Sequence, residues 1–384
     1  MGTRRGDLAG NPVRRFYTRR VMLTAGVDIG GTKVFAVLVD EDGSVCHRAS
    51  HPTDPEAGTA SIVLALDQLI GRAGSDDGPS TGSDPRSGAG STSRPSSASG
   101  SGPAAIGIAA AAYVAYPSGR IAFAPNLVYG QPDVAEAVRR RFQVDVVVEN
   151  DANAAAWAEQ QYGAGRGSDD TLMLTVGTGI GGGVVVRGEL FRGHLGFAGE
   201  FGHITLVDGG PLCACGERGC LEALASGNAI GRMAREGIAG APDSILLELA
   251  GDEPSRITGA LVSEAAHAGD EFAAEVLQRA GRWLGTGLAS LVNAFDPAVI
   301  VIGGSGAAAG WFLLEPARLE LDRRLGRRRP IPRIVTAVLG NDAGAIGAAS
   351  LARLRMAGHQ TGLPLSGQGG EGAGRRSQGP SLSE

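Results

Sequence analysis

Apolar runs separated by glycine-rich turns set the pattern of this chain. Residues 23–43 and 171–190 each read as a strand, a Gly-rich turn, a second strand and a short Gly-containing loop. Further buried strands are predicted at 45–49, 104–112, 144–148, 298–302 and 334–338. Helical spacing marks 56–71, 133–142, long segments between 226 and 295, and a final helix to about 355. The pattern predicts an α/β fold, and the repeated hairpin predicts two related lobes facing each other across a phosphate.

Three segments show no such pattern. Residues 1–21 are basic and lack periodicity, which predicts a disordered leader, and residues 359–384 are predicted to be a disordered tail. Residues 72–103 are almost wholly Gly, Ser, Pro, Asp and Arg, which predicts a flexible surface insertion rather than a domain boundary.

The ordered remainder divides into two predicted lobes. The small α/β lobe spans 22–152 and is completed by the C-terminal helix at 342–357. The large α/β lobe spans 153–341 and contains a Cys-rich loop followed by the helical segment. A length of 384 residues suffices for a two-lobed enzyme with an ample core.

Composition removes several classes of function. The hydrophobic fraction is 43%, and no apolar run approaches the roughly 18 residues that could span a membrane. No signal peptide is recognisable, so a cytoplasmic location is expected. A net charge of −5 gives no general attraction to nucleic acid.

One His and three Cys lie close together as H-x9-C-x-C-x4-C, at His203, Cys213, Cys215 and Cys220. Four such ligands on one loop predict a closed tetrahedral Zn2+ site, which is structural because it leaves no position for water. The alternatives are reduced thiols with a surface His, or a disulfide, although a disulfide framework would need more Cys.

Two carboxylates accompany these metal-ligand candidates. Glu200 lies three residues before His203, and Glu222 lies two residues after Cys220. If one imidazole nitrogen of His203 binds zinc, the other is fixed as a hydrogen-bonding group. The three side chains would then form a rigid polar set suited to the hydroxyls of a sugar. The alternative is that they are solvated loop acids.

The first Gly-rich turn, from Asp28 to Lys33, joins two strands. Backbone N–H groups around Gly30 and Gly31 can hold phosphate oxygens, Asp28 could hold Mg2+ through water, and Thr32 or Lys33 could touch the phosphates. Lys33 is the one Lys among 35 basic residues, which favours a specific role. The segment is not a P-loop, which needs a following helix, and it could be a plain hairpin with a Gly bulge.

Two later Gly-rich turns are candidates for ligand contact. Gly177, Gly179 and Gly182 match G-x-G-x-x-G, yet a strand rather than a helix follows, so the dinucleotide-binding interpretation fails. The turn beginning at Gly303 and Gly304 follows a buried strand and suits a flat ligand or the start of a helix.

Polar residues cluster where the strand at 144–148 ends. Asn150 and Asp151 precede an Ala-rich helix, a position typical of an active-site edge in an α/β sheet. Asp151 is the candidate general base for a sugar hydroxyl that attacks phosphorus. Alternatively, Asp or Asn residues here, Asn153 in particular, cap the helix.

Taken together, these motifs resemble the ROK family of sugar kinases, in particular its glucokinases of actinobacterial type. The resemblance covers about 24–355, apart from the insertion. The motifs are DIGGTK at 28–33, APNL at 124–127, ENDANAAAWAE at 149–159, GTGIGGG at 177–183, GEFGHI at 199–204 and CACGERGCLE at 213–222. The last two are highly specific because their spacing to each other is also correct.

The resemblance implies an ATP-dependent glucokinase that phosphorylates the 6-hydroxyl of glucose. It implies a two-lobed actin/hexokinase-like (ribonuclease H-like) fold, usually assembled as a homodimer or homotetramer. Asp151 would be the base, and Zn2+ would be structural. The implied sugar ligands are Asn126, Asn150, Asp151, Glu200, His203 and Glu222. The implied contacts to ATP with Mg2+ are Asp28, Gly30, Gly31, Thr32, Lys33, Gly177, Thr178, Gly179, Gly303 and Gly304.

One departure from the family pattern leaves alternatives open. A Gly is common in the family where this chain has Ala111, Ala112 and Tyr113, and the difference is expected to change the shape of one cleft wall and the sugar preference. Mannose, fructose or N-acetyl amino sugars, and polyphosphate as donor, remain alternatives. A sugar-sensing transcriptional repressor is disfavoured because only 27 residues precede Asp28, too few for a helix-turn-helix domain. A catalytically dead scaffold is disfavoured because Asp151 and the phosphate loops look intact.

Overall fold

The computed structural model describes residues 22–31, 33–53, 59–74, 102–124 and 133–358. The predicted leader and tail, most of the predicted insertion, Thr32 and Asn126 lie outside these residues. Helix α1 (Thr59–Gly74) extends past residue 72, where the predicted insertion begins.

The first sheet has the strand order β3-β2-β1-β4-β7. Its strands are β1 (Thr24–Ile29), β2 (Lys33–Val39), β3 (Val45–Pro52), β4 (Ala105–Ala110) and β7 (Asp145–Asn150). Strand β1 is antiparallel to β2 and parallel to β4, and β4 is parallel to β7. The carboxyl ends of β1, β4 and β7 therefore meet at one edge, where Ala110 pairs with both Ile29 and Asn150.

The second sheet repeats this plan in the order β10-β9-β8-β11-β12. Its strands are β8 (Thr171–Val176), β9 (Ile180–Val186), β10 (Glu189–Leu190), β11 (Val299–Gly303) and β12 (Arg333–Thr336). The first three are antiparallel neighbours, and β8, β11 and β12 are parallel. The mixed α/β fold and the repetition expected from the two Gly-rich hairpins are both present.

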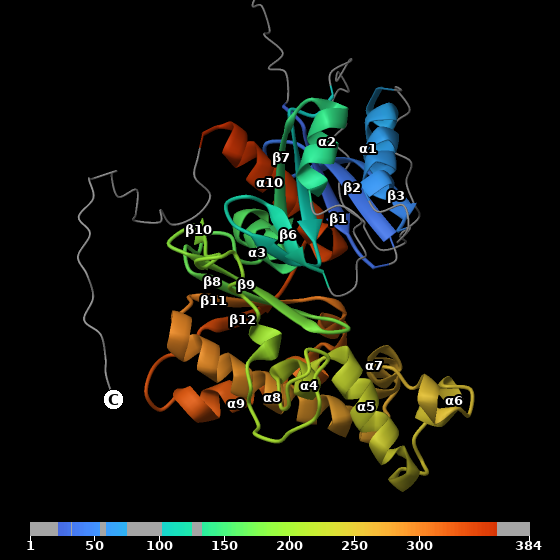
Figure 1. The fold of residues 1–384 in the computed structure, drawn as a ribbon. Coiled ribbons are helices and arrows are strands. Elements are labelled where there is room, and N and C mark those ends of the chain that lie inside the picture. Colours follow the sequence, from blue (N-terminus) through green and yellow to red (C-terminus); the bar gives the residue numbers. More distant parts are fainter. Residues whose placement is uncertain (1–21, 32, 54–58, 75–101, 125–132, 359–384) are drawn as a thin grey trace, which may run out of the picture.

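Two helices lie between the sheets, and each packs mainly on the sheet that it does not follow along the chain (Figure 1). Helix α3 (Asp151–Tyr162) follows the last strand of the first sheet but packs on β8 and β9 of the second. Helix α10 (Ala343–Met356) follows the last strand of the second sheet but packs on β1 and β4 of the first. The two helices also pack on each other.

Glycine permits the close approach of α10 to the first sheet. A Cβ atom at Gly107 of β4 would lie 1.9 Å from the carbonyl oxygen of Ala348, and one at Gly26 of β1 would lie 1.9 Å from that of Ala345. Helices α1 and α2 (Val134–Phe142) cover the other face, where Ile62, Leu66 and Leu69 of α1 are fully buried.

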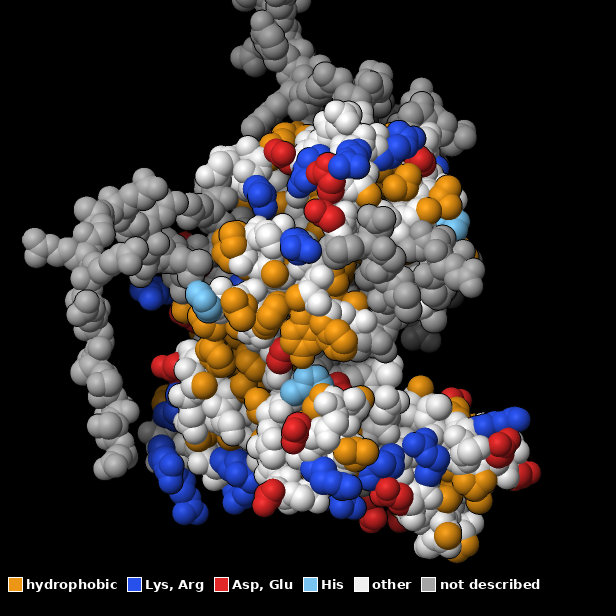
Figure 2. Space-filling view, viewed as in Figure 1, with side chains coloured by type: hydrophobic (Ala, Val, Ile, Leu, Met, Phe, Trp, Pro, Cys, Tyr) orange, Lys and Arg blue, Asp and Glu red, His pale blue; other side chains and the backbone are white. Residues whose placement is uncertain are grey.

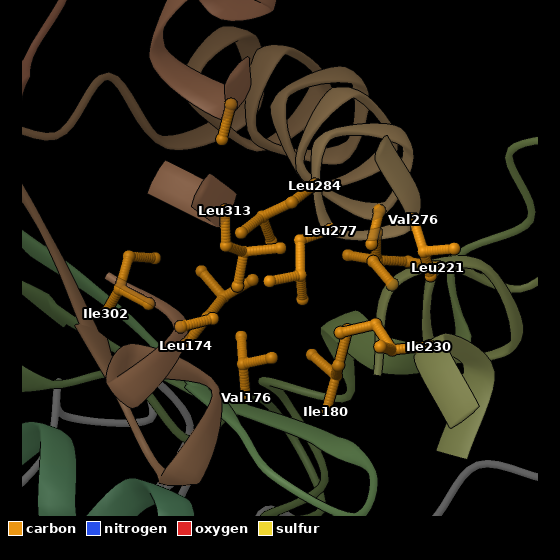
Figure 3. Packing of buried hydrophobic residues seen from close by; sticks show 14 of the residues in the cluster. Leu174, Val176, Ile180, Leu221, Ile230, Val276, Leu277, Leu284, Ile302 and Leu313 are labelled. Atoms are coloured by element: carbon orange, nitrogen blue, oxygen red, sulfur yellow. The ribbon is translucent and has the colours of Figure 1, made fainter. Parts of the chain in front are cut away.

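A helical layer covers the outer face of the second sheet. It contains α4 (Leu221–Ala225), α5 (Gly227–Gly237), α6 (Leu246–Leu249), α7 (Gly259–His267), α8 (Glu271–Phe295) and α9 (Trp311–Leu325). Figure 3 shows Leu277 and Leu284 of α8 packed toward Leu174 of β8 and Leu313 of α9, and all four are fully buried. The spacing of Leu277, Leu284, Leu288 and Leu291 in the sequence corresponds to this buried face.

Smaller elements complete the described residues. A hairpin of β5 (Tyr113–Ala115) and β6 (Arg120–Phe123) follows β4. Short 3-10 helices lie at Phe201–His203, Ile238–Gly240, Pro254–Arg256, Ser305–Ala309 and Gly340–Asp342. Among the described helices, none has both the length and the apolar character needed to cross a membrane.

Candidate functional site

Asp151 occupies the first turn of α3, where the edge of the first sheet meets the second sheet. The residue before it, Asn150, ends β7 and caps the helix, because its side-chain oxygen accepts a 2.9 Å hydrogen bond from the N–H of Asn153. The cap is therefore Asn150 and not Asn153. The Asn150 amide nitrogen also donates to the carbonyl of Ala112 at 3.2 Å, so this predicted sugar ligand is already held by two protein groups.

Two carboxylates at this edge have raised pKa values. Burial raises the pKa of Asp151 to about 6, and the nearby Glu200 adds to the effect, although backbone N–H groups at the start of α3 oppose it. Burial raises the pKa of Asp28 to about 7, and the charge of Asp151 contributes. Asp28 and Asp151 thus lie close enough to interact, as do Asp151 and Glu200.

Asp28 lies against the beginning of α10. A Cβ atom at Gly344, in the first turn of that helix, would come within 2.6 Å of the Asp28 Oδ2. The two carboxylates therefore sit near the N-termini of the two central helices, where the helix dipole favours negative charge. The exposed Lys33 lowers the pKa of Asp28, and its ammonium lies 5.7 Å from the ring centroid of Phe35.

The predicted metal ligands converge. One ligand atom from each of His203, Cys213, Cys215 and Cys220 lies within 4.8 Å of every other. The Sγ atoms of Cys215 and Cys220 are 3.8 Å apart, and the Sγ of Cys213 is 3.7 Å from Nδ1 of His203. A tetrahedron with Zn–S bonds of about 2.3 Å has edges of roughly 3.8 Å, so these separations fit zinc. All four cysteines of the chain are free, which disfavours the disulfide alternative.

Backbone pairing shapes the Cys-rich loop. Thr205 pairs with Cys220, and Leu212 pairs with Arg218, in two isolated antiparallel bridges. Gly219 has a φ of +74°, and a Cβ atom there would lie 1.7 Å from the carbonyl oxygen of Val207, so only Gly fits this crossing. The fold of the loop thus holds the ligand atoms together.

His203 joins this cluster to the predicted sugar-binding carboxylate. Its Nδ1 faces Cys213, whereas its Nε2 lies 3.9 Å from Oε2 of Glu200. If the first nitrogen binds a metal, the second remains a polar group beside Glu200. Burial raises the pKa of Glu200, while His203 and the hydroxyl of Tyr113 oppose that rise.

Glu222 connects the Cys-rich loop to the second Gly-rich turn. It lies in the first turn of α4, and its Oε2 accepts a 2.9 Å hydrogen bond from the N–H of Ile180. A Cβ atom at Gly179 would come within 2.3 Å of the same oxygen. The other oxygen, Oε1, lies 3.5 Å from the Sγ of Cys213. Glu222 therefore touches both the Cys cluster and the turn at 177–179.

The structure groups two of the three predicted nucleotide turns. Gly227 donates to the carbonyl of Gly177 at 2.7 Å, which fixes the turn at 177–179 on the start of α5. Gly304 has a φ of +80°, and a Cβ atom there would lie 2.5 Å from the carbonyl oxygen of Val176, so the turn at 303–306 packs beside the first. A strand, β9, follows the turn at 177–179, as the sequence indicates.

The β5–β6 hairpin and the loop at 191–200 meet across the site, which the sequence did not predict. The rings of Tyr113 and Phe197 pack edge to face with centroids 5.4 Å apart, and the Tyr113 hydroxyl interacts with the carboxylate of Glu200. The N–H of Tyr116 donates to the carbonyl of Leu195 at 3.0 Å. Figure 2 shows hydrophobic side chains gathered between the part of the molecule built on the first sheet and the part built on the second sheet.

Comparison with known proteins places this arrangement among sugar kinases. The sequence model of the ROK family matches residues 94–355. A glucokinase from Streptomyces coelicolor is 40% identical over 86% of this chain and 98% of its own length. A ROK family glucokinase from Streptomyces griseus, solved in complex with glucose and AMPPNP, is 39% identical with a TM-score of 0.71, covering 86% of this chain and 99% of that one. A ROK hexokinase from Thermus thermophilus is 33% identical with a TM-score of 0.68, covering 88% and 100%.

Proposed function

This chain belongs to the ROK family, and we propose that it is an ATP-dependent glucokinase, a hexokinase-type phosphotransferase that converts glucose to glucose 6-phosphate. The observation that carries the proposal is the placement of Asp151. It stands at the start of α3, close enough to both Glu200 and Asp28 to interact with each. Phosphoryl transfer to a hydroxyl uses a carboxylate base held near the bound acceptor and near the metal that binds the phosphates.

Asp151 acts as the general base in this proposal. Its pKa of about 6 leaves it ionised at neutral pH and closer to the working pH than an ordinary Asp. As the 6-oxygen of glucose attacks the γ-phosphorus of ATP, the hydroxyl proton passes to Asp151. The bond from the γ-phosphorus to the β,γ-bridging oxygen breaks, and ADP leaves. Catalysis rests mainly on positioning and charge neutralisation.

The sugar is held by the polar groups around Asp151. We assign this role to Glu200, His203 and Glu222, together with Asn150. His203 is suited to it because its Nε2 faces Glu200 rather than the Cys cluster. Asn126, which the family resemblance adds to this set, lies outside the described residues.

The nucleotide is assigned to the Gly-rich turns. Gly30 and Gly31, with Thr32 and Lys33, would approach the phosphates from the first sheet, and Gly177, Thr178, Gly179, Gly303 and Gly304 would approach the nucleotide from the second. Asp28 would hold Mg2+ through water, and that ion, when bound, neutralises charge on the phosphates. The position of Asp28 beside Asp151 supports this assignment.

Zn2+ is assigned to His203, Cys213, Cys215 and Cys220. The mutual distances of the four ligand atoms suit a tetrahedral ion, and the set leaves no open position. The ion would stabilise the loop and fix the ring of His203. A homodimer or homotetramer and a cytoplasmic location stay predictions, and light scattering after size-exclusion chromatography tests the first.

The test is a coupled assay of ADP release with wild type, Asp151→Ala and Asp151→Asn. We expect kcat with glucose and ATP to fall by about 100-fold to 10,000-fold in both variants, because a positioned general base contributes that much to the rate. Metal analysis should find one zinc per chain in all three proteins, with unchanged circular dichroism. Near-normal turnover in either variant would remove Asp151 from the mechanism.

The same assay decides the substrate. Initial rates with mannose, fructose and N-acetylmannosamine, and with polyphosphate in place of ATP, are compared with those for glucose and ATP. The proposal expects the highest kcat/KM for glucose with ATP. A higher value for another sugar or donor would keep the phosphotransferase chemistry and replace the substrate.

A further inference from the structure

A buried ion pair between Arg192 and Glu149 lies next to the proposed base, because Glu149 is two residues before Asp151. Nε of Arg192 donates to Oε2 of Glu149 at 2.6 Å, and the two side chains are only 4% and 6% exposed. Neither residue is used in the proposed chemistry. Buried ion pairs add little net stability, because desolvation of both charges offsets their attraction. The pair therefore invites an explanation other than stability.

Glu149 holds the beginning of α3. Its Oε1 accepts a 3.0 Å hydrogen bond from the N–H of Asn150 and a 3.2 Å hydrogen bond from Nδ2 of Asn153. Asn150 is the N-cap residue just before Asp151, and Asn153 lies two residues after Asp151 in the first helical turn. The orientation of the Glu149 carboxylate thus sets where the first turn, and the proposed base with it, lies.

Arg192 holds the loop that ends in Glu200. Its carbonyl accepts a 3.0 Å hydrogen bond from the N–H of Ala198, which closes the loop on itself. Its guanidinium carbon lies 4.9 Å from the ring centroid of Tyr116, in the β5–β6 hairpin. Tyr116 in turn donates through its backbone to Leu195 of the same loop. The guanidinium therefore connects its own loop to two other segments, β7 through Glu149 and the β5–β6 hairpin through Tyr116.

We propose that Arg192 is a positioning residue that sets the placement of Asp151 relative to Glu200. Through Glu149 it fixes the turn that carries the base, and through its own loop and Tyr116 it fixes the segment that carries the sugar ligand. This inference rests on the proposed kinase function for its kinetic consequence. The link itself, from loop 191–200 to the first turn of α3, is a property of the fold.

Arginine is suited to this role in a way that lysine is not. A planar guanidinium can donate to a carboxylate and stack on an aromatic ring at the same time, whereas an ammonium is a single point charge. Arg192→Lys keeps a cation beside Glu149 and so leaves no uncompensated buried charge. It removes the simultaneous stacking on Tyr116 and the fixed direction of the hydrogen bond.

The test compares Arg192→Lys and Arg192→Ala with wild type. We expect the kcat/KM for glucose to fall at least about tenfold in Arg192→Lys and further in Arg192→Ala, because misplacement by about 1 Å can cost about 100-fold. The KM for ATP should stay within about twofold of wild type, since the effect lies on the sugar side. If Arg192→Ala fails to fold, Arg192→Lys carries the test.

Ser350→Ala is the matched control. It removes a buried 3.1 Å hydrogen bond from Trp157, in the middle of α3, and a 2.9 Å hydrogen bond with the hydroxyl of Tyr162 at the end of α3. Both lie away from the first turn of the helix. We expect it to lower the melting temperature while glucose kinetics stay within about twofold of wild type. Loss of stability alone would therefore not explain a kinetic change in the Arg192 variants.

Amide hydrogen exchange gives a readout that does not depend on activity. In Arg192→Lys, the amides of 193–200 and of the first turn of α3 should exchange at least about tenfold faster than in wild type, with the rest of α3 unchanged. Unchanged exchange together with glucose kinetics within twofold of wild type would overturn the inference. If wild type phosphorylates no sugar, the proposed function fails, and the exchange result alone decides whether Arg192 holds the link.

Discussion

At the scale of single residues, Asp151 experiences opposing influences. The backbone N–H groups at the start of α3 favour the carboxylate, whereas burial and the charge of Glu200 favour the protonated form. The net effect is a pKa of about 6 against an ordinary value of 3.8. The same position that makes Asp151 a suitable base therefore makes its charge costly to the folded chain.

Asp151→Asn should consequently be inactive but more stable at high pH. The folded chain holds the Asp151 proton more tightly than the unfolded chain, so the stability linked to this group is lost as pH rises from about 4 to about 6. Asn avoids that loss. We expect a gain in the free energy of unfolding of roughly 1–3 kcal/mol at pH 8 and little or none at pH 4. Urea unfolding at both pH values measures it, and a loss of stability at pH 8 would contradict the account.

The hydroxyl of Tyr113, in the β5–β6 hairpin, meets the carboxylate of Glu200. Tyr113→Phe removes that hydroxyl and keeps the ring against Phe197. A hydrogen bond to a charged group contributes about 1.5–3 kcal/mol, so the KM for glucose should rise about tenfold or more with a smaller change in kcat. An unchanged KM would mean that Tyr113 does not orient Glu200.

At the scale of elements, the helices and strands with strong periodicity were predictable to within a few residues. The hairpin at Tyr113–Phe123 was missed because its strands have only three and four residues. Helix α9 was missed because it contains Pro316, a residue that disfavours the interior of a helix. Its packing on α8 is what overrides the weak local pattern.

The close packing of α10 on β4 depends on the absence of a side chain at Gly107. Gly107→Ala would place a Cβ atom 1.9 Å from the backbone oxygen of Ala348, so helix and sheet must separate. We expect a loss of at least about 1–3 kcal/mol in the free energy of unfolding. Gly71→Ala in α1 is the control: no atom lies within 4 Å of the added Cβ, and Ala there should stabilise by about 0.5–1 kcal/mol. Equal melting temperatures for the two variants would contradict this account.

At the scale of the whole molecule, local motifs were predictable and long-range pairings were not. His203 and the three Cys lie on one short segment, so their spacing alone indicated a common site, and their ligand atoms do converge. Arg192 and Glu149 are 43 positions apart, and only the fold brings them together. No periodicity or motif near Arg192 marks it, because its role depends on partners from β7 and the β5–β6 hairpin.

The repeated sheet topology supports a division into two lobes. We propose that residues 22–152 with 342–357 form the small lobe and that residues 153–341 form the large lobe. The cleft residues then come from both: Asp28 and Asp151 lie at the edge of the first sheet, while Glu200, His203 and Glu222 lie on the segment after the second sheet's hairpin. A sugar bound between them would contact both lobes at once.

The exchange of α3 and α10 between the two sheets has a consequence for how the gene for this chain could have arisen. Each sheet is followed along the chain by a helix that covers the other sheet. In an ancestor of half this length, the helix after the sheet would not pack on that sheet. The exposed face would be covered only in a domain-swapped dimer, by the same helix of a second copy. The exchanged helices are therefore the arrangement expected if two copies of a small protein that shared their last helices became one gene by fusion.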